Sequence, residues 1–168
     1  MKLNFIDSLT GLFNTTYFNK KLEDEYQHAL RYNTPLSLSL LDIDQLGEFH
    51  DRLGRKAAEA YMKGLASLIA SCIRKVDIAA RHRDKEIAII MPHTTGESAS
   101  IQSERLRDMA STLEVTFENH TILSTVSIGV ASLNFDAGMA TKGLITAAGK
   151  ALDTAKEEGK NRIVLNRT

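Results

Sequence analysis

The feature that most constrains the fold is an alternation of helix-like and strand-like segments, with a pair of short strands between two helices. Residues 78–81 and 87–91 are apolar runs separated by the polar residues 82–86, a pattern that predicts a β-hairpin. Helical periodicity precedes this hairpin over 56–74 and follows it over 97–113. Parallel crossovers alone do not produce a hairpin in this position. The sequence therefore predicts an α/β (α+β) fold in which helices surround a mixed central β-sheet.

The remaining segments extend this alternation. A helix is expected over 15–32, with Asn14 as its N-cap, and the apolar run 36–43 predicts a buried strand. The apolar stripe of that first helix consists of Phe18, Leu22, Tyr26 and Leu30. A polar stretch with two glycines follows the strand. The other expected elements are a hairpin of strands 115–118 and 122–133 around Asn119 and His120, a helix over 141–158 that ends before Gly159, and a strand over 163–165.

Length and composition set limits on the function. The 168 residues fit one domain, 1–168, which we expect to be a module of a larger signalling protein. The 21 Lys and Arg residues balance 21 Asp and Glu residues, so no bulk positive charge favours nucleic acid. The single cysteine, Cys72, excludes an internal disulfide and favours a reducing compartment. No apolar run approaches the ~20 residues of a membrane span. We therefore expect a cytoplasmic domain without membrane contact.

Four short motifs occur in order along nearly the whole chain. They are Asp7-Ser8-Leu9-Thr10-Gly11-Leu12-Phe13-Asn14, Leu41-Asp42-Ile43-Asp44, Ser127-Ile128-Gly129-Val130-Ala131 and Ala151-Leu152-Asp153-Thr154-Ala155-Lys156-Glu157-Glu158-Gly159-Lys160-Asn161. Together they resemble the GGDEF family of diguanylate cyclases, which make cyclic di-GMP from GTP. The resemblance implies a fold related to nucleotidyl-cyclase and polymerase palm domains.

The defining motif of that family is altered here. Alignment places Arg83-Asp84-Lys85-Glu86-Ile87 where the family has Gly-Gly-(Asp/Glu)-Glu-Phe. Arg83 and Asp84 add side chains where glycine lets the backbone approach the nucleotide. Lys85 replaces a carboxylate that, with the counterpart of Asp42, holds two divalent metals in the family. We therefore interpret Asp42, Lys85 and Glu86 as a vestigial catalytic set, with Asp42 as the single remaining candidate metal ligand.

The nucleotide pocket implied by the resemblance is also altered. The family reads guanine with an Asn and an Asp, which correspond to His50 and Glu59. The basic pair that holds phosphates corresponds to Lys156 and Lys160. We therefore expect no required cofactor, with Mg²⁺ only if GTP binds.

A second family motif is retained. Arg74-Lys75-Val76-Asp77 matches an R-x-x-D motif that binds cyclic di-GMP and inhibits the enzyme, and Arg105 aligns with an arginine that completes the site in some members. An arginine fork suits the O6 and N7 edge of guanine, and a carboxylate accepts from guanine N1–H and N2–H₂. The alternative is a surface ion pair worth ~0–1 kcal/mol.

These observations predict a catalytically inactive receptor for cyclic di-GMP that signals to a partner domain in the parent chain, such as a phosphodiesterase or sensor domain. A dimer linked by the ligand is an expected arrangement. The alternatives are a GTP-binding allosteric module, an interaction scaffold without nucleotide and, last, a weakly active cyclase.

Overall fold

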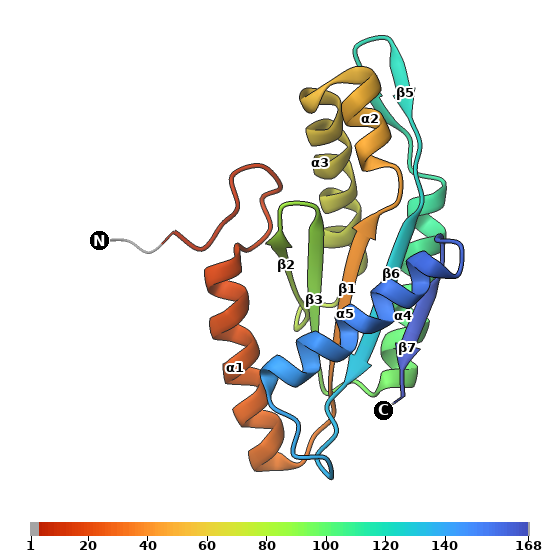
Figure 1. Ribbon diagram of the computed structural model, residues 1–168. Coiled ribbons are helices and arrows are strands. Elements are labelled where there is room, and N and C mark those ends of the chain that lie inside the picture. The colour runs from red at the N-terminus through yellow and green to blue at the C-terminus, as the bar shows by residue number, and fades with distance from the viewer. Residues whose placement is uncertain (1–3, 168) are drawn as a thin grey trace.

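The computed structural model describes residues 4–167 and contains a five-stranded sheet with helices on both faces (Figure 1). The strand order is β2-β3-β1-β6-β7, and only β6 and β7 pair in parallel. The mixed sheet predicted from the sequence is therefore confirmed. In chain order the elements are α1 (Thr15–Tyr32), β1 (Leu36–Ile43), α2 (Leu46–Leu53), α3 (Arg55–Cys72), β2 (Ile78–Arg83), β3 (Glu86–Pro92), α4 (Gly96–Ser111), β4 (Val115–Phe117), β5 (His120–Ile122), β6 (Val126–Ser132), α5 (Thr141–Glu157) and β7 (Ile163–Asn166).

The sheet is covered on both faces, which explains the continuous apolar run of β1. Helices α1 and α5 lie on one face, and α2, α3 and α4 lie on the other (Figure 1). Leu38 and Leu40 of β1 are buried against α1 and α5, and Leu41 and Ile43 are buried on the opposite face, against α2, α3 and α4. Within residues 4–167, no helix combines the length and the apolar character needed to cross a membrane.

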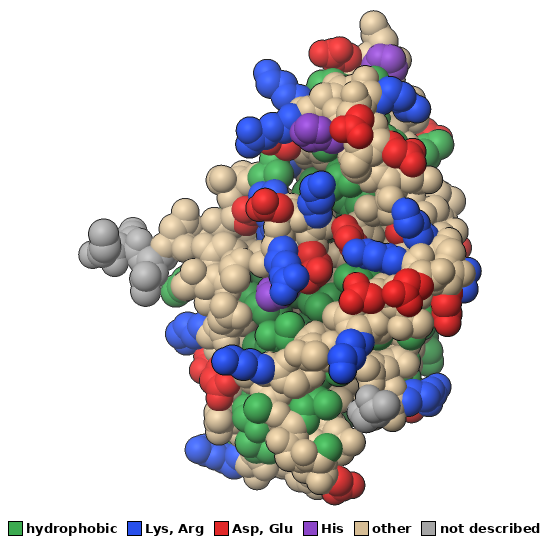
Figure 2. All heavy atoms as spheres, viewed as in Figure 1, with side chains coloured by type: hydrophobic (Ala, Val, Ile, Leu, Met, Phe, Trp, Pro, Cys, Tyr) green, Lys and Arg blue, Asp and Glu red, His purple; other side chains and the backbone are tan. Residues whose placement is uncertain are grey.

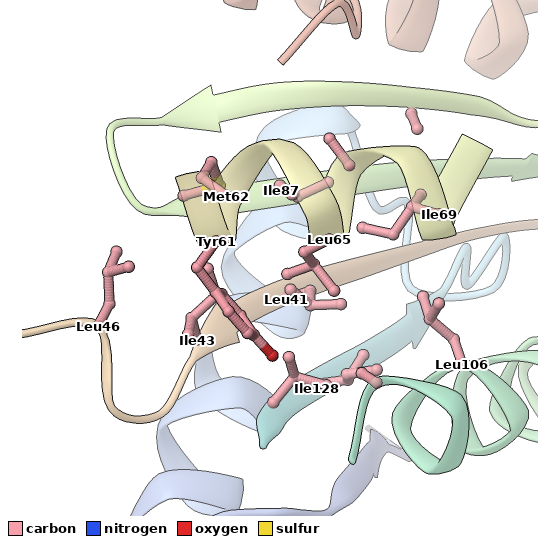
Figure 3. Packing of buried hydrophobic residues seen from close by; sticks show 14 of the residues in the cluster. Leu41, Ile43, Leu46, Tyr61, Met62, Leu65, Ile69, Ile87, Leu106 and Ile128 are labelled. Atoms are coloured by element: carbon pink, nitrogen blue, oxygen red, sulfur yellow. The ribbon is translucent and has the colours of Figure 1, made fainter. Parts of the chain in front are cut away.

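The largest fully buried side chain of the core on the α3 face is that of Tyr61. Tyr61 is fully buried and points toward Ile43 and Ile128 of the sheet (Figure 3). Its hydroxyl donates to the carbonyl oxygen of Ser124 at 3.4 Å. Burial raises the pKa of Tyr61 to about 12, so this side chain stays neutral and serves the core.

The α5 face depends on a close approach between helix and strand. A Cβ atom at Gly129 of β6 would lie 2.2 Å from the carbonyl oxygen of Ala148 and 2.2 Å from the backbone nitrogen of Leu152. Both atoms belong to the backbone of α5, so they cannot swing aside as a flexible side chain would. Glycine at this position therefore allows α5 to cross directly over the sheet.

The sequence prediction missed helix α2. It treated the stretch with Gly47 and Gly54 as polar connection, whereas Leu46–Leu53 is helical and buries Leu46 and Phe49. Gly54 has a φ of 91° and separates α2 from α3. Eight residues with two buried side chains carry too short a periodic signal to stand out in the sequence.

Two further predictions were wrong in detail. The strand expected over 122–133 is two strands, because Ser124 leaves the ladder and accepts a hydrogen bond from the backbone nitrogen of Gln45 at 3.3 Å. As a result, β5 pairs only with β4, and β6 joins the main sheet. In α1, Leu30 is 44% exposed and the neighbouring Ala29 takes the core position.

Candidate functional site

The altered signature lies on the hairpin of β2 and β3, and the sheet brings it beside the end of β1. In the strand register, Asp42 faces Glu86 of β3 on one side and Ser127 of β6 on the other. Two of the three residues predicted to be a vestigial catalytic set, Asp42 and Glu86, are thus strand neighbours. Lys85 is exposed at the hairpin tip.

An ammonium group already neutralises the carboxylate of Asp42. The Nζ atom of Lys156 on α5 lies 2.5 Å from Oδ2 of Asp42. Glu86 has a raised pKa, chiefly because it is buried, and the nearby charge of Asp42 adds to the shift. The opposing effects of Arg83 and Lys156 on this pKa are too small to reverse the shift.

This donor set does not fit Mg²⁺. The ion prefers near-octahedral coordination by oxygen ligands. Here the carboxylate of Asp42 is paired with Lys156, and the signature position that supplies the other carboxylate in the family is Lys85. Among residues 4–167, no group of three His, Cys, Asp or Glu side chains is placed to hold a metal ion. We therefore derive no chemistry through a metal at this position.

The second aspartate of the Leu41–Asp44 motif has a structural role. Asp44 accepts hydrogen bonds from the hydroxyls of Thr125 (2.5 Å) and Ser127 (2.6 Å) and from the backbone nitrogen of Asn161 (3.0 Å). It thereby joins the end of β1 to the start of β6 and to the loop after α5. That loop carries Lys160 and Asn161, both with positive φ (64° and 48°). Asp44 therefore shapes the loop that resembles the phosphate-binding segment of the family.

The two residues predicted to form a vestigial guanine pocket, His50 and Glu59, lie together, and Lys85 lies beside them. His50, Glu59 and Lys85 line one hollow of about 310 Å³ between α2, α3 and the hairpin. Within it, Nε of Arg55 lies 2.9 Å from Oε1 of Glu59. The carboxylate of Glu59 is thus already paired with a cation.

The hairpin is held against the first motif of the chain. Arg81 donates to the carbonyl oxygen of Asp84 at 2.9 and 3.2 Å and lies 3.3 Å from Oδ1 of Asp7. Hydrogen bonds from Thr10 and the charge of Arg81 outweigh burial and lower the pKa of Asp7. Acidic and basic side chains are interspersed over this face of the molecule (Figure 2), in keeping with the balanced net charge.

The two lysines predicted to hold phosphates occupy different settings. Lys156 is half-buried and bound to Asp42, whereas Lys160 is exposed in the loop after α5. Of these two lysines, the structure places only Lys156 in direct contact with a residue of the predicted catalytic set, Asp42.

The R-x-x-D residues form a tight ion pair at the turn before β2. Nε and Nη2 of Arg74 donate to Oδ2 and Oδ1 of Asp77 at 3.1 and 2.7 Å. The Asp77 side chain is 0% exposed, and that of Arg74 is 44% exposed. These hydrogen bonds raise the pKa of Arg74. The pair borders a hollow of about 280 Å³ whose lining also includes Leu12 and Phe13.

Arg105 lies exposed on α4, so it is accessible to a ligand.

Sequence reasoning missed Thr94, whose hydroxyl accepts from Nη2 of Arg74 at 2.6 Å. A signal was available, because Thr94 follows Pro92 at the end of a strand, where hydroxyl side chains often bond to the backbone.

Sequence reasoning also missed His82. Its imidazole is 10% exposed and packs on the ring of Phe18, with centroids 4.7 Å apart. Among residues 4–167, its two ring nitrogens are the buried side-chain atoms without a hydrogen-bond partner. Burial lowers the pKa of His82, and the charge of Arg83 lowers it further.

Comparison with known proteins agrees with this geometry. The family model described as "Diguanylate cyclase, GGDEF domain" matches residues 4–162. Diguanylate cyclase A of Treponema denticola is 33% identical over 132 residues, which is 79% of this chain and 35% of that protein. Response regulator PleD of Caulobacter vibrioides is 30% identical over 98% of this chain and 36% of that protein. The chain thus spans about a third of the length of these relatives.

A solved structure gives the same result for the fold. The GGDEF domain of DgcB from Caulobacter crescentus, solved in complex with c-di-GMP, superposes with a TM-score of 0.93 at 26% identity and covers 100% of this chain and 99% of that one. The strand order, the four motifs and these matches lead to one assignment: the chain belongs to the GGDEF domain family of diguanylate cyclases.

Proposed function

We propose that this chain is a catalytically inactive GGDEF domain that acts as a cyclic di-GMP receptor through Arg74, Asp77 and Arg105. The observation that carries the proposal is the contrast between two sites. The signature hairpin has Lys85 in place of a metal-binding carboxylate, whereas the Arg74–Asp77 pair is intact and the Arg74 side chain is 44% exposed. A domain built in this way retains binding without synthesis.

The ligand class follows from the charges at the turn. Cyclic di-GMP carries two phosphates and two guanines, and arginine suits both groups, because it pairs with phosphate and stacks on purine rings. Lys75 adjoins the pair and lines the same hollow. The DgcB domain, solved in complex with c-di-GMP, supports this choice of ligand.

A second candidate function is a GTP-binding allosteric module. The observation in its favour is the hollow of about 310 Å³ in which Arg55, Arg81 and Lys85 lie near His50. These cations would neutralise phosphates in place of a metal. The ion pair of Arg55 with Glu59 opposes this candidate, since it occupies the carboxylate that corresponds to a guanine-reading group.

The signal from such a receptor passes to another domain or protein. The cyclic di-GMP phosphodiesterase NbdA of Pseudomonas aeruginosa is 30% identical over 92% of this chain, which covers only 20% of that protein. The cyclase SiaD, solved with its activator SiaC, superposes at a TM-score of 0.92 with 26% identity. We therefore propose a cytoplasmic module whose partner is a signalling domain in the same chain.

Calorimetric titration with cyclic di-GMP and with GTP, each with and without Mg²⁺, tests this function. Losing a charged partner from a desolvated contact costs ~2–5 kcal/mol, and ~1.4 kcal/mol is tenfold, so Arg74→Ala should weaken cyclic di-GMP binding about 30-fold or more. Arg105→Ala should have a smaller effect, and Asp42→Ala should have little effect. If Arg74→Ala binds normally while Asp42→Ala or Lys156→Ala does not, the ligand uses the vestigial pocket. Absence of any binding would leave the scaffold as the function.

A further inference from the structure

Two histidines from distant parts of the chain meet beside α1. His28 lies on α1 and His93 directly follows β3, and the centroids of their rings are 5.4 Å apart with the ring planes at 84°. Both residues are exposed. They line a hollow of about 480 Å³ that α1 shares with the turn before β2 and the end of β3. The fold thus creates a pair of imidazoles that no local sequence motif indicates.

Neither imidazole is used by another group of the protein. Within residues 4–167, the two rings have no hydrogen-bond or ion-pair partner. Their ring contacts are with each other and, for His28, with the ring of Tyr32 at a centroid distance of 4.6 Å. A neutral imidazole carries a lone pair on one ring nitrogen. Each histidine therefore has a nitrogen available as a ligand.

The separation of the rings suits one shared metal ion. With Zn–N bonds of ~2.1 Å and a tetrahedral angle, the centroids of two imidazoles on the same ion lie ~5 Å apart. The observed centroid distance is 5.4 Å. The last torsion of a histidine side chain has a broad energy profile, so an exposed ring turns at little cost. Such a rotation directs one nitrogen of each ring toward the ion without moving the backbone.

The backbone of His93 has a conformation that few residues adopt. Its φ is 52°, in the left-handed region. Histidine, asparagine and aspartate occur there more often than other residues that carry a Cβ atom. In this conformation the side chain of His93 contacts α1 through His28. Asparagine at this position would therefore keep the turn while removing the imidazole.

The charges around the hollow do not exclude a cation. Lys21 and Glu25 form an ion pair at 3.2 Å, and Lys75 and Asp77 also line the hollow, so the two signs balance. Imidazole nitrogen suits Zn²⁺, whereas Mg²⁺ prefers oxygen ligands. Among residues 4–167, no third His, Cys, Asp or Glu side chain completes a metal-binding group. Water molecules would therefore fill the other coordination positions.

We propose that His28 and His93 together bind one Zn²⁺ ion, which joins α1 to the end of β3. The inference rests on no part of the proposed function, because neither histidine belongs to the signature hairpin or to the R-x-x-D motif. An ion that binds the folded domain and not the unfolded chain stabilises the fold by mass action. Zn²⁺ bound here therefore tightens the packing of α1 on the sheet.

Calorimetric titration with Zn²⁺ tests the site, with Mg²⁺ as the control ion. The unmodified domain should bind one Zn²⁺ ion, and His28→Gln and His93→Asn should each weaken this binding about tenfold or more. His120→Gln, at an exposed histidine of β5, is the matched control and should bind normally. If each variant instead halves a stoichiometry of two, the histidines bind separate ions and the proposal fails. Absence of binding up to about 1 mM Zn²⁺ overturns it as well.

Thermal unfolding provides a second measurement. At a free Zn²⁺ concentration of about ten times the Kd, binding should raise the Tm of a domain of this size by roughly 3–6 °C. The rise should disappear in His28→Gln and in His93→Asn and remain in His120→Gln. Both substituted side chains are exposed, so these variants should fold, which circular dichroism without metal verifies. An equal rise in all the variants would place the ion elsewhere and refute the proposal.

Discussion

The ammonium of Lys156 and the carboxylate of Asp42 form an ion pair 2.5 Å long at the point where β1 ends beneath α5. This pair supports the proposal that metal binding is lost, because a cation of the protein itself neutralises the carboxylate of Asp42. Glu86, the strand neighbour of Asp42, has a raised pKa because it is buried. Lys85 and the ion pair of Asp42 are therefore the two observations that support the proposal of an inactive site.

The domain should not synthesise cyclic di-GMP from GTP with either Mg²⁺ or Mn²⁺. Lys85 repels the metal that must neutralise the triphosphate, and the side chains of Arg83 and Asp84 occupy the place of two glycines. Product formation is measured by chromatography against a reaction without protein. Product above that background, and abolished by Asp42→Ala, would contradict this expectation.

The single change Lys85→Glu should not restore synthesis. It returns one carboxylate, but Asp42 remains paired with Lys156 and the pocket still holds His50 and Glu59. Groups that act as a catalytic unit do not contribute additively, so one restored ligand gives little activity. The same chromatographic assay applies, and robust turnover by this variant alone would identify Lys85 as the only defect.

Gly129→Ala should destabilise the fold by about 3 kcal/mol or more, at the upper end of overpacking effects. The new methyl group would meet backbone atoms of Ala148 and Leu152 at 2.2 Å, so α5 must move away from β6. Gly149→Ala is the control on α5, the helix that packs over Gly129, because a Cβ atom at Gly149 would have no contact within 4 Å among the described atoms. Helix propensity predicts a gain of up to about 1 kcal/mol there. Urea denaturation measures both, and equal stability of the two variants would refute the close packing.

His82→Phe should stabilise the domain, and its advantage should grow as the pH falls below 6.5. The folded state lowers the pKa of His82 from 6.5, so the unfolded chain binds the proton more readily. The contribution of neutral His82 is therefore complete above pH 6.5 and is lost on acidification. Phenylalanine keeps the contact with Phe18 and does not titrate.

Glu86 titrates in the opposite sense but does not obscure this comparison. Its folded pKa lies above 4.5, so its effect favours the folded state at low pH and is lost as the pH rises. Because Oε1 of Glu86 lies 3.8 Å from Nε2 of His82, the substitution is also compared in a Glu86→Gln background, where the difference between the unfolding free energies isolates His82. A difference that stays constant from pH 8 to pH 5 would show that His82 gains no proton on unfolding in this range.

The sequence predicted most of the fold because long elements repeat their pattern many times. Helices such as α1 and α5 and the buried strand β1 have enough periodic positions to identify their type. The helix α2 and the break at Ser124 were missed because tertiary contacts decide them. Ser124 bonds to Gln45, which lies far away in the sequence, so no local pattern reveals that the strand ends there.

The sequence indicated which residues of the candidate site lie close together, but not how they are buried or hydrogen-bonded. Family register placed His50 with Glu59 in one pocket and Arg74 with Asp77 in one motif, and the members of each pair lie together in the structure. It did not indicate that Asp77 is fully buried. It also did not indicate the hydrogen bond between Arg74 and Thr94, which lies 20 positions further along the chain.

The first motif of the chain has a consequence for self-association. Phe13 donates to the carbonyl of Ala79 at 3.3 Å and accepts from the backbone nitrogen of Arg81 at 2.8 Å, and it bridges in parallel to Ala80. It thus occupies hydrogen-bonding groups of β2, which is an edge strand of the sheet. Exposed edge strands template pairing with other chains. The segment around Phe13 therefore covers part of the edge of β2. A protein shortened to begin at α1 would leave this edge free to pair with a strand of another molecule.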